Sequence, residues 1–147
     1  MTVLPKARQA ARRLAVVTGR VCAGCESVTS ARCCSPDFCR IVRAGLEVEG
    51  LEIPPEPGGY GVPFLDPEHG CTVPPELRPG CTGFVCARAG PDVMRERTKL
   101  MRRLLDDPLA ARLADQGSRL AGEFLARTLG VDVGTLEQVR DLLGGVL

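Results

Sequence analysis

The sequence predicts a mainly α-helical fold in which helices at both ends of the chain enclose a small, irregular core rich in cysteine, with little or no β-structure. Three observations lead to this prediction. Apolar residues recur at helical spacing near both ends of the chain. All eight cysteines fall between these parts, in two segments with little predicted regular structure, the second of which is rich in Pro and Gly. A chain of 147 residues is long enough to bury one core but not two, so we expect one compact unit.

The composition is that of a globular protein with few aromatic side chains. Hydrophobic residues make up 44% of the chain and aromatic residues only 3%. Because aromatic side chains usually fill much of a core, their scarcity indicates that something else helps to order the central region. The net charge of +1 gives no electrostatic footprint of nucleic acid. No stretch approaches the roughly 20 apolar residues that span a bilayer. We therefore expect neither nucleic acid nor a membrane as a partner.

The N-terminal helix is predicted over residues 4–17, where apolar residues follow helical spacing. Arg8, Arg12 and Arg13 lie mostly off this apolar stripe, and we interpret them as a solvated face. The N-terminal part has no apolar run of about seven residues or more followed by a small-residue cleavage site. We therefore expect no secretory signal and a cytoplasmic location.

The central part of the chain contains little predicted regular structure. Residues 20–40 form a first cysteine segment, and residues 41–53 read as a short helix followed by an extended piece. Residues 54–63 form a loop by composition, because Pro fixes φ and Gly frees it. Residues 62–90 form a second cysteine segment, in which we expect regular structure to be short.

The pattern becomes helical again after residue 90. A helix is predicted over residues 91–106, and a second over residues 108–129, with Asp107 as its N-cap and Gly130 as its end. A capping box at residues 135–138 opens a last short helix. We expect these helices to run antiparallel.

The predicted division of the chain follows from this change of pattern. Residues 1–90 form a cysteine-cluster domain with its N-terminal helix, and residues 91–147 form a C-terminal helical hairpin that packs on it.

The cysteines occur at spacings typical of metal ligands. The C-x-x-C motif at residues 22–25 lets both sulfurs turn toward one ion, and the C-x4-C motif at residues 81–86 contains a glycine and suits a chelating loop. The adjacent Cys33 and Cys34 can hardly form a mutual disulfide. The full set of candidate metal ligands is Cys22, Cys25, Cys33, Cys34, Cys39, Cys71, Cys81 and Cys86.

Three states of these thiols are open: disulfides, ligation of a metal or cluster, and free buried thiols. In the reducing cytosol that we expect, clustered cysteines more often bind metal than form disulfides. Tetrahedral zinc and a 4Fe–4S cluster each take four thiolates, so Zn²⁺ and iron both remain open. Metal binding would also order a segment with so little regular structure.

These motifs resemble the YkgJ-like family of zinc- or iron-chelating cysteine-cluster domains over residues 21–86. The family opens on C-x-x-C-x-x-C-C, to which the cysteines at residues 22–34 are similar. The resemblance implies a thiolate metal site rather than a known reaction. Further matches to the later part of the family pattern are Phe64, Leu65, Gly70, Cys71, Arg78, Pro79, Cys81, Phe84 and Cys86.

The chain departs from the family pattern at four places: Val73-Pro74 replace an I-Y pair, the R-P-x-x-C element has lost one residue, and two further departures concern the number and spacing of the cysteines. The gap between Cys25 and Cys33 is longer than in the family, and Val62 stands where the family often has a cysteine. Cys39 has no counterpart in the pattern, which makes it a candidate to replace the thiol missing at Val62.

No catalytic constellation is visible in the sequence. His69 is the only histidine, so a two-histidine iron site cannot form, and no hydroxyl nucleophile has a base and an orienting acid at recognisable spacing. His69, Asp66 and Glu68 could serve as metal ligands, but such residues are more commonly exposed loop and turn residues. For Arg78 we expect a structural role, bonded to carbonyl groups or to sulfur.

The sequence therefore leads to three hypotheses. The first is a metal-binding protein that holds zinc or iron by clustered thiolates. The second is an iron–sulfur protein for electron transfer or redox sensing. The third is a helical adaptor with structural zinc, which would bind a protein partner through the C-terminal helices, at the Met- and Leu-bearing face of residues 94–105. For that face, packing on the core is the more common role.

Overall fold

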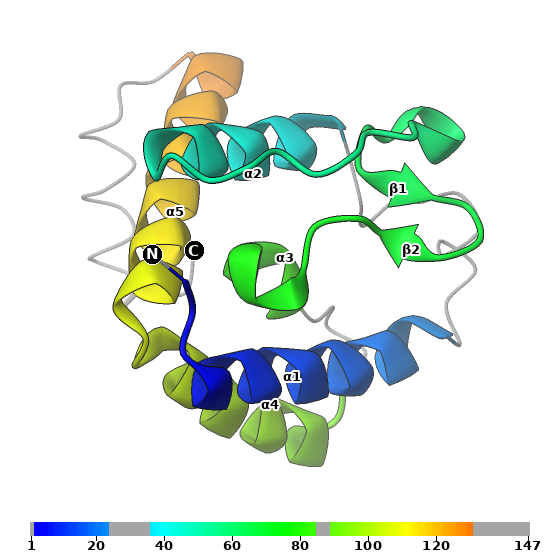
Figure 1. The fold of residues 1–147 in the computed structure, drawn as a ribbon, viewed down its shortest axis with the longest axis vertical. Coiled ribbons are helices and arrows are strands. Elements are labelled where there is room, and N and C mark those ends of the chain that lie inside the picture. The colour runs from blue at the N-terminus through cyan, green and yellow to red at the C-terminus, as the bar shows by residue number, and fades with distance from the viewer. Residues whose placement is uncertain (1, 24–35, 85–88, 131–147) are drawn as a thin grey trace.

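The computed structural model describes residues 2–23, 36–84 and 89–130, apart from the side chains of residues 20–23, 124, 125, 128 and 129. This part of the chain is mainly helical, as predicted, with one small two-stranded sheet. In Figure 1, α1 and α4 run along the lower edge, α5 rises at the left, α2 crosses the top, and the short α3 lies between them. The α-helices are α1 (Pro5–Ala23), α2 (Pro36–Val48), α3 (Pro79–Thr82), α4 (Pro91–Leu105) and α5 (Pro108–Leu129).

Helix α1 continues to Ala23, beyond the predicted end at residue 17, and therefore includes position 22. Gly19 inside a helix costs about 1 kcal/mol relative to alanine, and contacts with α3 offset this cost. Thr18 is 7% exposed, and its hydroxyl lies 3.0 Å from the carbonyl oxygen of Leu14 and 3.2 Å from that of Thr82. The helix extends past residue 17 because Thr18 has a tertiary partner in α3.

Helix α2 begins at Pro36 rather than at residue 41, so it carries Cys39. The sequence contains the signal for this start, because a proline at the first helical position is followed by Asp37 in the first turn. The same pattern correctly predicts the start of α4 at Pro91. Cys39 thus lies on a helix rather than in a loop.

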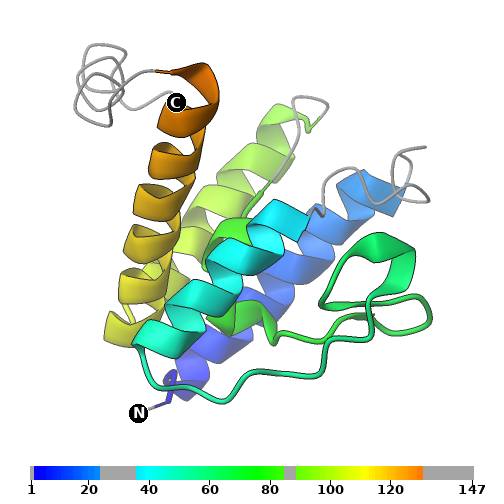
Figure 2. The same cartoon turned by 90° about the horizontal axis from the view of Figure 1, so that it is seen from above.

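The two C-terminal helices begin and end close to the predicted residues, but each packs mainly on an N-terminal partner. Helix α4 lies chiefly against α1, and α5 chiefly against α2 (Figure 2). In the face predicted over residues 94–105, Leu100 and Leu104 are buried in the core, whereas Met94 and Leu105 are exposed at its edge. The last predicted helix, residues 135–143, lies outside the described residues.

Two buried clusters form the core. The first unites α1, α4 and α5 across the predicted boundary at residue 90, and its alanines let α1 and α4 approach closely. The second lies around α2 and the small sheet. Leu51 and Leu77 pack against both clusters. The first cluster consists of Val3, Ala7, Ala10, Ala11, Leu14, Val17, Leu100, Leu104, Leu109, Ala110 and Leu113, and the second of Cys39, Leu46, Val62, Phe64 and Val73.

The sheet consists of β1 (Leu65–Asp66) and β2 (Gly70–Cys71), which pair antiparallel with Leu65 opposite Cys71. The turn between them is held by the Asp66 carboxylate, whose Oδ1 accepts hydrogen bonds from the backbone N–H groups of Glu68 at 2.8 Å and His69 at 3.2 Å. These bonds lower the pKa of Asp66. Regular structure in the described part of the second cysteine segment is short, as predicted. None of the described helices is both long and apolar enough to cross a bilayer.

Asp107 connects the first residues of the chain to the junction between α4 and α5. It is 3% exposed, and its carboxylate accepts three backbone hydrogen bonds: from Leu109 at 3.0 Å, Ala110 at 3.1 Å and Leu4 at 2.9 Å. The first two cap α5 as predicted, and the third ties the beginning of the chain to it.

Replacing Asp107 with alanine should lower the free energy of unfolding by about 2 kcal/mol, the upper end for a lost cap, because the N–H group of Leu4 loses its acceptor as well. Urea unfolding measures this loss. The neighbouring Asp106 is exposed, so Asp106→Ala is a matched control with an expected change under about 0.5 kcal/mol. Equal effects of both substitutions would contradict the role of this cap.

Candidate functional site

Three cysteines from separate parts of the chain line one cavity of about 260 Å³. Cys39 lies on α2, Cys71 ends β2 and Cys81 lies in α3. None of the three is in a disulfide bond. The fold therefore gathers three of the predicted ligands around one space.

The other walls of this cavity are mainly apolar. Phe64 and Val73 contribute buried side chains from the second cluster, and Thr18 and Gly19 contribute from α1. Phe84 lies at the opening and is 50% exposed. Arg78 is the one charged side chain among the described residues of the lining.

Arg78 is held in place by hydrogen bonds to its own loop. Its Nε donates to the carbonyl oxygen of Val73 at 2.8 Å, and its Nη1 donates to the hydroxyl of Thr82 at 3.2 Å. That hydroxyl donates in turn to the carbonyl oxygen of Pro75 at 2.8 Å. The predicted structural role of Arg78 is confirmed by its bond to the carbonyl oxygen of Val73, and the two bonds of its guanidinium also fix a positive charge in the wall of the cavity.

The pKa of the Cys81 thiol is strongly raised. Burial raises its pKa from an ordinary value of 9.0 to about 11, the charge of Arg78 lowers it, and the neighbouring Cys71 and Cys39 raise it. In the metal-free protein, Cys81 is therefore protonated at neutral pH. A metal ion bound there would have to displace this proton.

The raised pKa predicts a specific loss of stability at high pH. Below about pH 9 both the folded and the unfolded chain keep the proton on Cys81. Between about pH 9 and 11 the unfolded chain releases it first, so the free energy of unfolding falls, by up to about 3 kcal/mol. Urea unfolding of the reduced, metal-free protein at these two pH values measures the fall. Cys81→Ala should remove this part of the pH dependence, and an unchanged dependence in that variant would contradict the assignment.

Four of the other predicted ligands, Cys25, Cys33, Cys34 and Cys86, lie outside the described residues. Position 22 lies in the last turn of α1, although its side chain is not described. It follows Thr18 by four residues, and positions four apart share one face of a helix. Position 22 is therefore on the same helix face as position 18, whose threonine lines the cavity.

The predicted oxygen and nitrogen donors do not join these thiols. The side chain of His69 is 80% exposed, with its Nδ1 3.5 Å from Oδ1 of Asp66, and it does not line the cavity. The carboxylate of Asp66 is occupied by its turn. The prediction that His69 is an exposed loop residue is confirmed.

The three thiols surround a space rather than a single point. Within the described ranges, no group of three or more His, Cys, Asp or Glu side chains could hold a metal ion. A complete ligand set therefore needs donors beyond those described, or a group large enough to reach all three thiols.

The sequence did not predict an apolar cavity that adjoins this one. It has a volume of about 180 Å³, lies between α2, α3 and α5, and shares Phe38, Val42, Arg78 and Cys81 with the thiol cavity. Gly45 and Gly117 line it, one on α2 and one on α5. These small residues are a local signal of a close helix contact, but they do not reveal a cavity. Cys81 thus borders two spaces.

Comparisons of the chain with models of protein families, with curated proteins and with solved structures found no match. Membership of the YkgJ-like family remains a prediction from the cysteine motifs.

Proposed function

We propose that the protein holds zinc or iron through clustered cysteine thiolates at the cavity lined by Cys39, Cys71 and Cys81. The observation that carries this proposal is the convergence of these three thiols, from three separate segments, on one cavity. The reducing cytoplasm is the setting in which such thiols stay available for a metal.

The chemistry of the donors fits a metal that prefers sulfur. Thiolates select zinc and iron–sulfur clusters over magnesium or calcium, and no carboxylate lines the described part of the cavity. Four thiolates around a divalent ion leave a net charge of about −2, which the guanidinium of Arg78 would partly balance. Cys22 is the candidate for a fourth donor, because its position shares a helix face with Thr18.

An iron–sulfur cluster is the second candidate, and the spacing of the thiols favours it. The described thiols line a cavity without meeting at a point suited to one ion. A 4Fe–4S cluster has a ligand on each of four separate irons, so its thiolates need not converge on one atom. When bound, such a cluster would supply one-electron redox chemistry, and this chain would hold it behind the partly exposed Phe84.

The test is the content of metal and acid-labile sulfide, together with a visible spectrum, of protein purified without air and without a histidine tag. About one or two zinc ions per chain, with no sulfide and no colour, would support a thiolate zinc protein. Iron and sulfide in comparable amounts, with absorbance near roughly 400 nm, would support a cluster. Neither metal in the purified protein, and no uptake of either on reconstitution, would overturn the proposal.

A further inference from the structure

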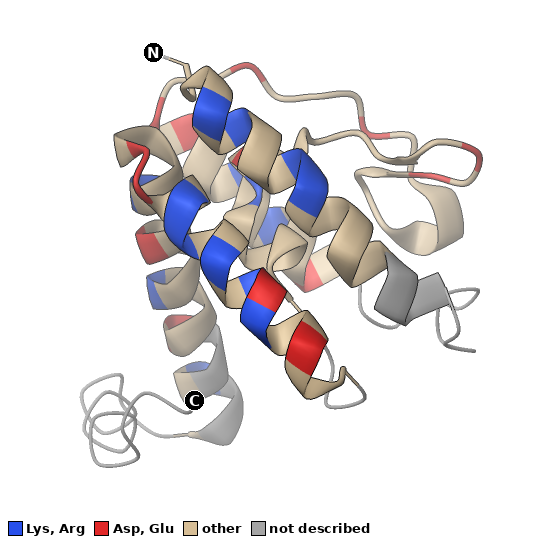
Figure 3. Ribbon diagram, turned by 90° about the horizontal axis from the view of Figure 1, so that it is seen from below, with Lys and Arg blue, Asp and Glu red and all other residues tan. Residues whose placement is uncertain are grey.

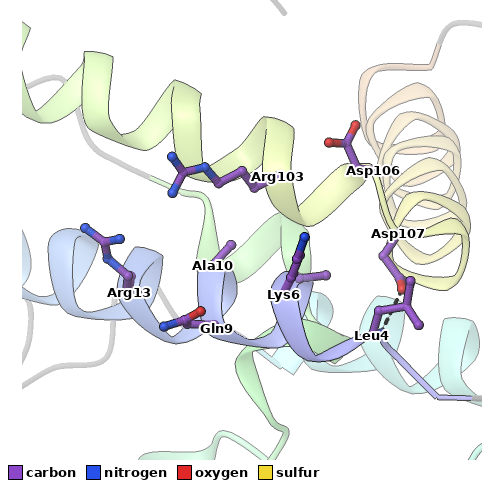
Figure 4. A pocket seen from close by; sticks show the side chains of 9 residues that line it. Leu4, Lys6, Gln9, Ala10, Arg13, Arg103, Asp106 and Asp107 are labelled. Carbon is purple, nitrogen blue, oxygen red and sulfur yellow. Dashed lines mark hydrogen bonds between the residues drawn. The ribbon is translucent and has the colours of Figure 1, made fainter.

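A groove between α1 and α4, away from the thiol cavity, is bordered by positive charges on both helices. Figure 3 shows Lys and Arg along these two neighbouring helices. The groove has a volume of about 470 Å³, and its lining includes Lys6 and Arg13 from α1 and Arg103 from α4 (Figure 4). The small side chain of Ala10 lies between these cations.

These cations have no acidic partner among the residues that the structure describes. Other arginines do: Arg43 is 2.8 Å from Glu56, and Arg112 is 3.0 Å from Glu49. Lys6, Arg13 and Arg103 are all exposed and form no ion pair within the described ranges. Their charges are therefore available to a ligand.

The acids at one end of the groove do not neutralise it. The carboxylate of Asp107 is buried and occupied by three backbone N–H groups. Asp106 is exposed, so the groove carries three cations against one accessible acid. This asymmetry gives the groove a direction, since a bound chain would meet positive charge along most of its length and negative charge at one end.

The lining of the groove fits a protein segment better than a nucleic acid. Among the described residues of its lining there is no aromatic side chain on which bases could stack, and the net charge of the chain is only +1. Leu4, 60% exposed, adds apolar surface at the end of the groove near Asp107, and the buried Ala10 leaves the space between the charges open. Lys6 and Arg13 are seven residues apart on one helix, about 10 Å or two turns, a spacing that carboxylates on one face of a second helix can match.

We propose that this groove docks an acidic, amphipathic helical segment of a partner protein. Its carboxylates pair with Lys6, Arg13 and Arg103, and an apolar side chain next to them covers the exposed Leu4. This proposal goes beyond metal binding and does not depend on it, because none of these residues lines the thiol cavity.

The test is fluorescence anisotropy with a labelled synthetic peptide that carries glutamates along one face of a helix and leucines directly beside them on that face. The double variant Lys6→Glu/Arg103→Glu should weaken its binding about tenfold or more, because like charges then face each other. The control Arg12→Glu/Arg102→Glu changes the net charge equally on the same two helices, but outside the groove lining. It should change the affinity less than about threefold, and added salt should weaken binding to the native protein.

Three results would overturn the proposal: no saturable binding of the peptide, equal losses in the two double variants, or tighter binding of a thymidine oligonucleotide or of anionic lipid vesicles than of the peptide. Circular dichroism checks that both variants fold. If the charge-reversed groove variant does not fold, Lys6→Gln/Arg103→Gln replaces it, with Arg12→Gln/Arg102→Gln as its control.

Discussion

Replacing Phe64 with alanine should lower the free energy of unfolding by about 3–5 kcal/mol. Phe64 is 1% exposed and is the largest fully buried side chain in the described part of the chain. It packs in one cluster with Cys39 and Val73 and also lines the thiol cavity. Truncation removes apolar surface from the core and enlarges an existing cavity. Because the cluster is too small for its side chains to move in and fill this space, we expect the full loss of stability that a new cavity causes.

Urea unfolding, followed by circular dichroism, measures this effect. Phe84→Ala is the matched control, because Phe84 lines the same cavity but is 50% exposed, and its truncation should cost less than about 1.5 kcal/mol. Phe64→Leu should fall between the two. If Phe64→Ala and Phe84→Ala cost the same, the second cluster does not stabilise the protein through burial of Phe64.

The sequence predicts a helix end correctly where neighbouring residues determine that end, and incorrectly where a distant part of the chain determines it. Asp107 and Gly130 bound α5 as predicted, since a cap acts through the backbone of its own residues: Asp107 through two N–H groups, and Gly130 through a φ of 70°. The end of α1 depends instead on α3, through the contact of Thr18 with Thr82. The apolar periodicity of residues 4–17 gives no information about that contact, so the predicted helix was too short.

The sequence could predict which cysteines are candidates for the thiol site, but not how they are arranged in space. Residue type and spacing suffice to nominate Cys39, Cys71 and Cys81. Their shared cavity depends on how α2, β2 and α3 pack, and no local motif encodes this. The proposed replacement of a thiol at Val62 by Cys39 remains a prediction, and the presence of both residues in one buried cluster supports it.

Replacing Cys81 with serine should weaken metal binding by more than about 100-fold, a loss larger than that for a residue that only orients a ligand. Cys81 lines the cavity together with Cys39, Cys71 and Arg78, and all three neighbours act on its pKa. A serine hydroxyl keeps the size of the side chain but stays protonated near neutral pH and is a poor ligand for metals that prefer thiolate. Metal content after purification, and competition with a chelator of known affinity, measure the loss.

Val42→Ala is the control that separates ligation from packing around Cys81. Val42 lines both cavities that Cys81 borders, so its truncation disturbs the same walls without removing a donor, and metal content should stay close to that of the native protein. Metal removal should lower the unfolding midpoint of the native protein and of Val42→Ala but not that of Cys81→Ser, because bound metal stabilises only the folded state that holds it.

Undiminished metal in Cys39→Ser, Cys71→Ser and Cys81→Ser alike would move the site to the remaining cysteines, where Cys25→Ser and Cys34→Ser should then abolish binding. Loss of metal in Val42→Ala to the same extent as in Cys81→Ser would instead mean that the cavity walls, not the thiol of Cys81, decide whether metal is held.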